Sequence, residues 1–341
     1  MHILVKKNTN YKGILILTHK ELSFFLQHLS KLSTNYYLFV HTGSIAAIMK
    51  HPLIKYNMVS DSRCVENNYI PFTSRNFLSK QFNNNSSIKN VNENIKFILQ
   101  KNNIIFPINI DIKNFTFIIN TRAADIKKAF ELLQYSLKYL DKNENDKICF
   151  ILLEQDINNN YYKKIINHWN KNKHKNICFI DTHLIDSKNK YYKGFTNEEL
   201  SNFYKSSKIY MHACESEGES RTIHEALCCG CMVLAKENMK GGGLDHLNNK
   251  NSILYNHTNV IEKMIYISNN HKNYIYNTDI FKKLNEEYTV DVFLNFIYNS
   301  LSYNNILSYE EFKYKSNTTQ LMFSLPGHNL SVPWYIKNKL T

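Results

Sequence analysis

The sequence predicts a mixed α/β fold built from two parallel sheets, each covered by helices. Continuous apolar runs of strand length alternate along the chain with amphipathic helical stretches. Strands that are apolar on both faces are typical of a parallel sheet buried between two helical layers. A length of 341 residues is enough for two such domains, each with its own core.

The first alternating stretch is short. It begins with the apolar strand 13–17, continues through a helical pattern over 20–32, and returns to a strand at 36–40. A less regular region follows, up to about residue 105, and it carries no clear alternation. The first sheet is therefore expected to be the smaller of the two.

The second stretch alternates regularly from residue 115 to residue 235. Its predicted strands are 115–119, 147–153, 176–180, 208–213 and 231–235, and its predicted helices are 124–140, 160–170, 197–206 and 221–229. Ligands of such sheets bind at the carboxyl ends of the strands. Polar and charged residues that directly follow these strands are therefore the first candidates for a functional site.

Composition is that of a globular protein, with 43% hydrophobic and 21% charged residues. No apolar run approaches the roughly 18 residues of a membrane helix, and the N-terminus lacks a signal-peptide pattern. A cytoplasmic protein is expected. Seven cysteines, mostly in apolar segments, favour reduced thiols, and Cys228, Cys229 and Cys231 lack metal-ligand spacing, so burial is expected for them.

Residues 214–235 read as a loop, a short helix and a buried strand. Glu217 lies in the loop, and Glu225 lies eight positions later on the second turn of the helix. Ser220 is expected to cap this helix through its side chain. Backbone amides near 219–222 would then face an anionic group, because the amino end of a helix favours negative charge.

This segment resembles the donor-binding element of family 4 retaining glycosyltransferases, S-x-x-E-G-F-G-x-x-x-x-E-A-x-x-x-G-x-P-V-V. Glu217, Gly218, Glu225, Ala226 and Gly230 match that pattern, and the chain departs from it at the two positions after Gly218. The resemblance implies that Glu217 contacts the sugar and Glu225 the ribose of a nucleotide sugar. The donor-binding residues it implies here are Glu217, Gly218, Glu219, Ser220, Arg221, Thr222 and Glu225.

A second part of the resemblance lies about a hundred residues upstream, after the strand 115–119. The family carries G-R-L-x-x-x-K-G at this turn, and Arg122 and Lys127 keep its spacing from Arg to Lys. A guanidinium and an ammonium suit a diphosphate leaving group, because both stabilise the charge that develops on it. Both flanking glycines of the family are replaced here, by Thr121 and Lys128.

The resemblance also implies the GT-B architecture, two Rossmann-like domains facing a central cleft. The expected divisions are an acceptor-side domain at 1–110, shorter than in the family, a donor-binding domain at 111–305, and a tail at 306–341 that returns to the first domain. The stretch 108–115 resembles the interdomain segment of the family. His41, at the end of an apolar strand, is the candidate residue beside the anomeric carbon.

Other motifs carry weaker expectations. Gly242 and Gly243, in the segment 240–245, offer backbone amides without side-chain obstruction, and contact with the sugar or phosphates is expected. The loop 181–196 occupies the place where the family contacts the base. His212 and His224 are expected to be packing residues rather than ligands.

Charge is unevenly distributed along the chain. Residues 1–110 contain 13 Lys and Arg residues against 4 Asp and Glu residues, within a total formal charge of +13. A basic acceptor-side domain favours an anionic acceptor: an acidic membrane surface bound peripherally on its inner face, a phosphorylated glycan or lipid, or DNA. The alternative is that these lysines are simply solvated and that their excess reflects only an AT-rich genome.

The expected function is retaining transfer of a hexose-type sugar from a nucleoside-diphosphate sugar, with UDP as the expected nucleotide, to a cell-surface or lipid-linked glycan. His41 and Glu217 are the candidate catalytic residues, and neither a metal nor a cofactor is expected. Three alternatives remain open: a DNA-modifying glycosyltransferase acting on a modified base, a non-catalytic sugar-nucleotide-binding relative, and a sugar-nucleotide epimerase of the same architecture.

Overall fold

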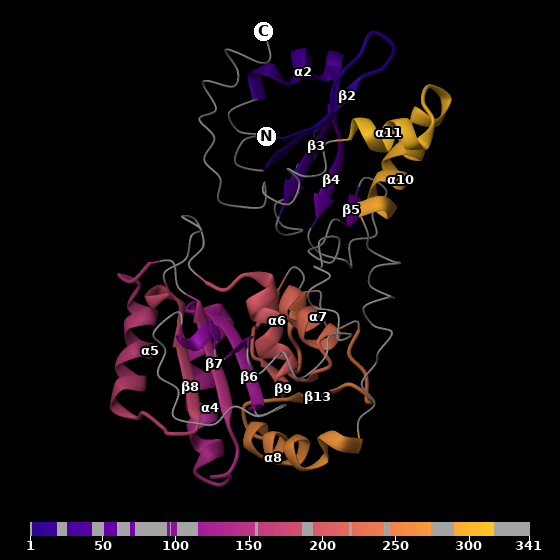
Figure 1. Ribbon diagram of the computed structural model, residues 1–341. Helices are drawn as coiled ribbons and strands as arrows, with labels where there is room; N and C mark the ends of the chain where they lie inside the picture. Colours follow the sequence, from indigo (N-terminus) through magenta and orange to yellow (C-terminus); the bar gives the residue numbers. More distant parts are fainter. Residues whose placement is uncertain are drawn as a thin grey trace. The chain divides into compact units, whose positions relative to one another are not determined.

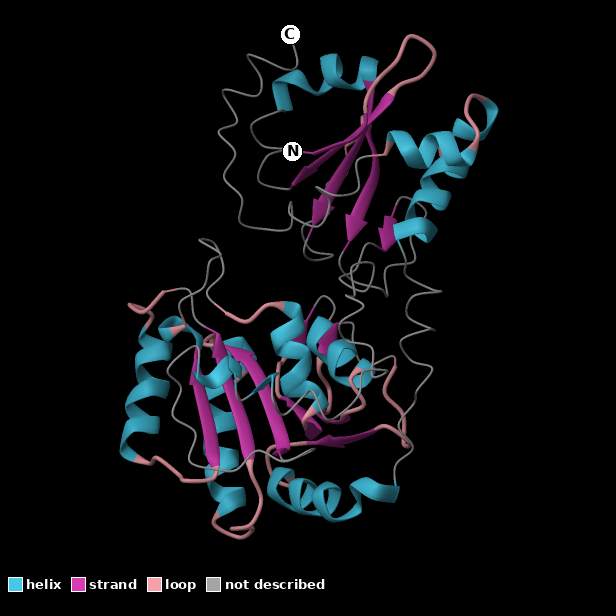
Figure 2. Ribbon diagram, viewed as in Figure 1, coloured by secondary structure: helices cyan, strands magenta, loops and turns pink. Residues whose placement is uncertain are grey.

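The chain separates into two compact units, described here from a computed structural model. The first unit combines Met1–Phe77 with Leu284–Thr341, and the second is Leu78–Lys283. The structure describes residues 2–18, 26–42, 51–59, 69–71, 94–95, 97–100, 115–153, 156–185, 194–217, 220–241, 244, 246–273 and 290–316. In both units helices flank a central sheet (Figure 2).

The first unit holds a five-stranded sheet in the order β1-β2-β3-β4-β5. The edge strand β1 is antiparallel to β2, and the other neighbours are parallel. The strands are β1 (His2–Val5), β2 (Gly13–Thr18), β3 (Tyr36–Thr42), β4 (Ile54–Val59) and β5 (Tyr69–Pro71). The helical segments are η1 (Leu26–His28), α2 (Leu29–Asn35), α10 (Val290–Ser300), η8 (Tyr303–Asn305) and α11 (Tyr309–Lys315).

Strand β2 is apolar on both faces because the sheet is covered on both sides. Ile14 and Ile16 pack in a cluster with residues of α10 and α11, whereas Leu15 and Leu17 pack in a second cluster with α2. Successive side chains of a strand point to opposite faces, so this split follows directly from the alternation. The two helical layers of the unit can be followed in Figure 1.

The two ends of the described chain meet in the first unit. Ser316, after α11, forms an antiparallel bridge with Val5 of β1. The Tyr303 hydroxyl donates a hydrogen bond to the Lys12 carbonyl, and its ring contacts Tyr11 edge-on at 5.7 Å. Segments 2–18 and 290–316 therefore share one core although nearly the whole chain separates them.

The second unit holds a six-stranded parallel sheet in the order β13-β11-β9-β6-β7-β8 and a short parallel pair, β10 with β12. The strands are β6 (Phe115–Arg122), β7 (Ile148–Leu153), β8 (Ile177–Asp181), β9 (Ser207–His212), β10 (Ser216–Glu217), β11 (Met232–Lys236), β12 (Lys240–Gly241) and β13 (Ser252–Tyr255). The helical segments are η5 (Asp125–Lys127), α4 (Ala129–Leu140), α5 (Asn160–Lys171), η6 (Thr182–Leu184), α6 (Asn197–Lys205), α7 (Arg221–Cys228), α8 (Val260–Asn270) and η7 (His271–Asn273).

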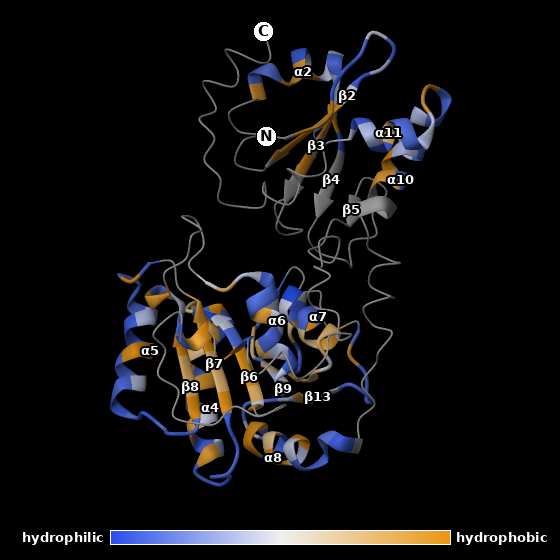
Figure 3. Cartoon of the chain, in the orientation of Figure 1, coloured by the Kyte–Doolittle hydropathy of each residue, from blue (hydrophilic) through white to orange (hydrophobic). Residues whose placement is uncertain are grey.

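Helices cover both faces of this sheet. Phe117 and Ile119 of β6 join a core cluster with α4, α5 and α8 on one face. On the other face, Tyr210 of β9 packs edge-on against Tyr204 of α6 at 5.7 Å, and its hydroxyl donates to Thr222 of α7 at 2.7 Å. Figure 3 shows apolar residues concentrated on β6, β7 and β9, as expected for strands buried on both sides.

The predicted alternation of strands and helices in the second unit is confirmed, with one correction. The helix predicted over 124–140 is divided into η5 and α4, because Lys128 adopts a left-handed backbone conformation with φ 54°. The helical pattern predicted over 20–32 falls partly outside the described residues. In the described part, the helix α2 runs over Leu29–Asn35. Elements that the sequence did not predict are β1, β4, β5, β10, β12, β13, α8, α10 and α11.

The predicted domain boundary at 110/111 stays a prediction, since residues 101–114 lie outside the described chain. The same holds for the interdomain resemblance over 108–115 and for the tail beyond residue 316. Residues 290–305, predicted to belong to the donor-binding domain, pack in the first unit through α10 and η8. Among the helices that the structure describes, none combines the length and apolarity needed to cross a bilayer.

Candidate functional site

The candidate site lies at the carboxyl end of two neighbouring parallel strands, β6 and β9. Strand β6 ends at Arg122 and is followed by η5, whereas β9 ends at His212 and is followed by the loop that carries β10. Because both loops leave the same edge of the sheet, residues far apart in the sequence become neighbours. The first half of the sequence motif falls on the loop after β6, and the second half begins on the loop after β9 and continues into α7.

Lys127 and Glu217 meet across this edge. The Lys127 ammonium forms an ion pair with Glu217 Oε1, although 90 residues separate the two positions. The side chains are 14% and 17% exposed, so the pair is largely shielded yet open to a ligand. The Glu215 amide donates to the Ile126 carbonyl at 3.1 Å and fixes the distance between the two loops. The structure thus places a cation and a carboxylate side by side.

Glu215 fastens the loop that carries Glu217. Its carboxylate lies 3.3 Å from the Lys236 ammonium and 3.4 Å from that of Lys128. The hydrogen bond from Lys236 is the main cause that lowers the pKa of Glu215 below its ordinary value. The parallel pairing of Glu217 with Gly241 in the β10–β12 ribbon holds the other side of the loop. Glu217 is therefore positioned by contacts on both sides.

His212 is buried beneath this pair. Its Nδ1 lies 3.1 Å from the Tyr210 oxygen, and its carbonyl accepts a hydrogen bond from the Tyr255 hydroxyl at 3.1 Å. Burial lowers the pKa of His212 to about 4, with Lys127 acting in the same direction and Glu217 against it. The ring is therefore neutral near pH 7. The expectation that His212 is buried in the packing is confirmed.

Glu225 is a buried carboxylate on α7. Its Oε1 accepts a hydrogen bond from Arg221 Nε at 2.8 Å, while Oε2 has no hydrogen-bond partner among the described residues. Burial raises the pKa of Glu225 to about 7, and Arg221 opposes that shift. Buried acceptors are normally satisfied. An unfilled carboxylate oxygen here suits a ligand that donates hydroxyl groups.

The start of α7 corrects one expectation. Ser220 occupies the N-cap position, but its side chain makes no capping hydrogen bond to the helix. Its hydroxyl lies instead 3.3 Å from Thr222 Oγ1, whose oxygen also accepts from Tyr210. The hydroxyl network of the helix start thus competes with the cap. Arg221 is more than half exposed and is anchored through Glu225.

The remaining predicted residues are less fully defined. Arg122 is exposed at the end of β6, and its carbonyl accepts a hydrogen bond from the Ala124 amide at 2.8 Å. His41 lies in β3, paired with Thr18 and Met58, and its side chain is outside the described part. Predictions that fall outside the described residues concern Gly218, Glu219, Gly242, Gly243, residues 186–193 of the base-contact loop 181–196, and the C-terminal tail after residue 316.

Several residues of this site were not predicted from the sequence. Cys214, Glu215 and Lys128 lie on the loops that hold Glu217 and Lys127, and the Tyr210 hydroxyl is hydrogen-bonded to His212 at the end of β9. The polar residues that interrupt the apolar strand end, Tyr210 and His212, are the signal that could have identified them. Alternate residues of a strand share a face, which places Tyr210 and His212 together.

The family model described as "Glycosyl transferases group 1" matches residues 100–274, just over half of the chain. A search of curated proteins finds no match. The fold resembles α,α-trehalose-phosphate synthase (UDP-forming) from Burkholderia vietnamiensis, with TM-score 0.56, 8% identity, and coverage of 87% of this chain and 74% of that one.

A second similar structure is Anabaena HepE in complex with UDP. The TM-score is 0.55 at 11% identity, and the alignment covers 86% of this chain and 79% of HepE. The same protein in complex with UDP-glucose gives TM-score 0.55 at 12% identity, with coverage of 84% and 78%. At these identities the likeness concerns the fold, and it confirms the predicted α/β fold of the GT-B class.

Proposed function

Because the chain belongs to the group 1 glycosyltransferase family, we propose that it transfers a hexose-type sugar from a nucleoside-diphosphate sugar with retention at the anomeric carbon. The proposal includes membership of family 4, through the carboxylates Glu217 and Glu225 and their E-x7-E spacing. UDP is the proposed nucleotide, and the binding of UDP and UDP-glucose by HepE supports that choice.

One observation carries the proposal. Lys127 and Glu217 form an ion pair between adjoining loops at one sheet edge, and Glu225, with its unfilled oxygen, lies on α7, the helix that follows the loop of Glu217. A sugar nucleotide needs cations for its diphosphate and carboxylates for its hydroxyl groups. This edge offers both kinds of group, which supports donor binding more directly than the overall likeness of fold does.

Each residue has a distinct proposed role. Lys127 has three ammonium hydrogens, so it can keep Glu217 and also donate to a diphosphate oxygen. Arg122 adds a second cation where charge develops on the leaving diphosphate. Glu225 accepts from the ribose hydroxyls, and Glu217 accepts from the sugar hydroxyls. His41 is proposed to line the reaction centre, and no catalytic metal is assigned.

The acceptor is proposed to be an anionic glycan or lipid-linked glycan at a membrane surface. The excess of basic residues in residues 1–110 supports an anionic acceptor, and it equally supports DNA carrying a modified base. Because the family match lies at 100–274, a protein that binds the donor without transferring it is the second candidate. Transfer and hydrolysis assays with UDP-sugars separate these candidates.

The test begins with calorimetric titration of UDP, GDP and ADP without added metal, on the wild-type protein and on Glu225→Ala. We expect UDP to bind, and Glu225→Ala to weaken UDP binding roughly 10–100-fold because it removes a charged hydrogen-bond acceptor. The matched control is Glu262→Ala, which removes an exposed carboxylate from α8 of the same unit.

Equal UDP affinity in wild type and Glu225→Ala would contradict the assigned donor site. For the reaction itself, NMR of the product should show the anomeric configuration of the donor sugar. An inverted product would contradict the retaining mechanism while leaving donor binding intact.

A further inference from the structure

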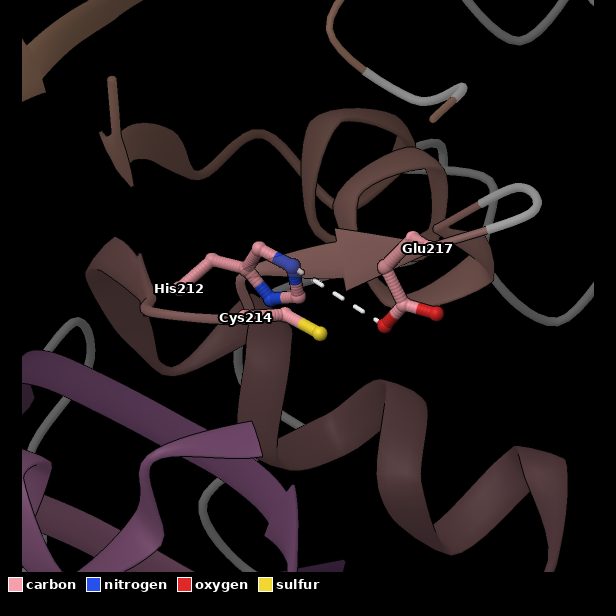
Figure 4. A group of neighbouring side chains, drawn as sticks. All are labelled: His212, Cys214 and Glu217. Carbon is pink, nitrogen blue, oxygen red and sulfur yellow. Dashed lines mark ion pairs between the residues drawn. The ribbon is translucent and has the colours of Figure 1, made fainter. Parts of the chain in front are cut away.

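His212, Cys214 and Glu217 converge at the end of β9 and the start of the following loop. One imidazole nitrogen, the sulfur and one carboxylate oxygen all lie within 4.8 Å of one another. Figure 4 shows the ring and the sulfur turned toward the carboxylate, with His212 Nε2 and Glu217 Oε1 4.0 Å apart. Nitrogen, sulfur and oxygen from three side chains therefore share one small space.

The hydrogen bonds around His212 leave a lone pair on Nε2. The Tyr210 hydroxyl donates its only proton to Thr222 at 2.7 Å, so the tyrosine oxygen accepts the hydrogen of Nδ1 at 3.1 Å. Nε2 is buried and meets no hydrogen-bond partner among the described residues. A histidine held through one nitrogen with the other unfilled is the usual arrangement of a metal ligand.

The other two ligand atoms are also available. Cys214 is a free thiol, as are the other cysteines that the structure describes, and its proton goes to the Ser216 carbonyl at 3.1 Å. Glu217 already binds a cation, the Lys127 ammonium, at the same oxygen that faces His212. A carboxylate that holds an ammonium in this position can hold a metal ion in its place.

We propose that His212 Nε2, Cys214 Sγ and Glu217 form a binding site for a thiophilic divalent cation of the Zn²⁺ type. Zn²⁺ binds these three atom types at about 2.0–2.3 Å, which brings tetrahedral ligand atoms to roughly 3.3–3.8 Å from one another. The side chains therefore close by about 1 Å around the ion. The thiol releases one proton, and the Lys127 ammonium leaves the Glu217 oxygen.

The ligand set selects among cations. Sulfur and imidazole nitrogen favour Zn²⁺ and Co²⁺, whereas Mg²⁺ and Ca²⁺ require mostly oxygen ligands. With three protein ligands, the fourth position is left to water. This cation has no assigned part in sugar transfer.

The consequence is inhibition, and this step rests on the proposed function. Glu217 and Lys127 are the residues assigned to the sugar and the diphosphate, so the cation and the nucleotide sugar compete for Glu217. Zn²⁺ should then weaken donor binding, and donor should weaken Zn²⁺ binding by the same factor.

The test is a titration of the full-length protein with Co²⁺ in the absence of nucleotide. We expect a thiolate-to-cobalt charge-transfer band in the near ultraviolet that Zn²⁺ abolishes by replacement, with release of one proton per ion. Cys214→Ser should lose the band, and His212→Gln should bind at least roughly 100-fold more weakly. Tyr210→Phe, which removes the acceptor of Nδ1–H, should bind roughly 10–100-fold more weakly.

The matched control is Cys178→Ser, which changes a buried free cysteine in β8 and should keep the band. Circular dichroism of each variant checks its folding. Because serine has nearly the same size as cysteine, Cys214→Ser and Cys178→Ser can be compared directly. No band in wild type up to millimolar Co²⁺, or a band that survives Cys214→Ser, would overturn the site.

Competition is tested separately by titrating UDP-glucose into protein saturated with Zn²⁺. Weakened UDP-glucose binding supports inhibition, and unchanged binding overturns it while leaving the cation site standing. If no nucleotide binds in any condition, the proposed function fails, and the Co²⁺ result still decides the cation site.

Discussion

Glu225 combines burial, one ion pair and an unfilled oxygen. Burial raises its pKa to about 7 from an ordinary value of 4.5, so the folded protein binds this proton more tightly than the unfolded chain does. The stabilising effect of the proton is complete below pH 4.5 and is lost as the pH rises through 7. Above pH 7 the protein carries a buried, charged carboxylate that the ion pair with Arg221 offsets in part.

We therefore expect Glu225→Gln to stabilise the ligand-free protein at pH 8 and to leave it nearly unchanged at pH 4.5. Glutamine resembles the protonated acid, so the gain at pH 8 is on the order of 1–3 kcal/mol, which is a few degrees in Tm. Thermal unfolding at several pH values measures it. A difference in Tm that stays constant from pH 4.5 to pH 8 would contradict the shifted pKa.

Part of the candidate site can be predicted residue by residue from the sequence. Glu217, Glu225 and Lys127 could be picked out because they match a known motif, but the contact of Lys127 with Glu217 joins positions 90 residues apart, and no periodicity reports that. His212 is predicted from the sequence as a packing residue, and its hydrogen bond with the Tyr210 hydroxyl and its approach to Glu217 are tertiary contacts that the sequence does not show. Residues that match the motif could therefore be predicted from the sequence, whereas the contacts of the buried residues that hold them in place, such as Tyr210 and His212, could not.

Among the elements, the junction of η5 and α4 departs most from expectation. The amphipathic pattern over 124–140 is continuous, yet Lys128 adopts φ 54° and separates the two helical segments. Hydrophobic periodicity does not predict a break at a single left-handed residue, because the apolar positions continue on the next helical turn. The family motif has glycine at this position, the residue that adopts such a conformation without steric cost.

We expect Lys128→Gly to be more stable than Lys128→Ala by about 1 kcal/mol. Both variants lose the ion pair with Glu215 at 3.4 Å, but only glycine relieves the left-handed backbone. Urea denaturation of the two variants and wild type measures the difference. If the Lys128→Ala protein proves as stable as the Lys128→Gly protein, backbone strain at Lys128 is refuted.

Other elements show where sequence patterns suffice. Strands β6, β7, β9 and β11 were predicted because they are apolar on both faces, and the parallel sheet follows from that pattern. Helix α6 begins at a capping box formed by Thr196 and Glu199. Strands β4 and β5 and helices α10 and α11 were missed, because short or mixed segments acquire their structure only from the sheet on which they pack.

In the whole molecule, the two units have separate cores. The cluster that joins β1, β2 and β3 to α10 and α11 belongs to the first unit, while the six cysteines that the structure describes are all buried in the second. The seventh, Cys64, lies in the sequence of the first unit. In a Cys64→Ser background, thiol labelling therefore reports unfolding of the second unit alone.

We expect Phe312→Ala to destabilise the first unit by about 3–5 kcal/mol, since Phe312 is fully buried and its loss leaves a cavity. Cysteine labelling in urea should keep its wild-type midpoint, whereas circular dichroism should show an earlier transition. Tyr314→Ala, which changes a 92% exposed ring of the same helix, is the control. A labelling midpoint that shifts with Phe312→Ala would show that the units unfold together.

The bridge between Val5 and Ser316 has a consequence for how the protein is made. During translation, β1 to β3 leave the ribosome first, but α10 and α11, which cover one face of them, are synthesised more than two hundred residues later. At about 5–20 residues per second, that delay is on the order of 10–50 s. The second unit is synthesised in the meantime, so the first unit begins first and finishes folding last, and one apolar face of its sheet lacks its covering helices until α10 and α11 leave the ribosome.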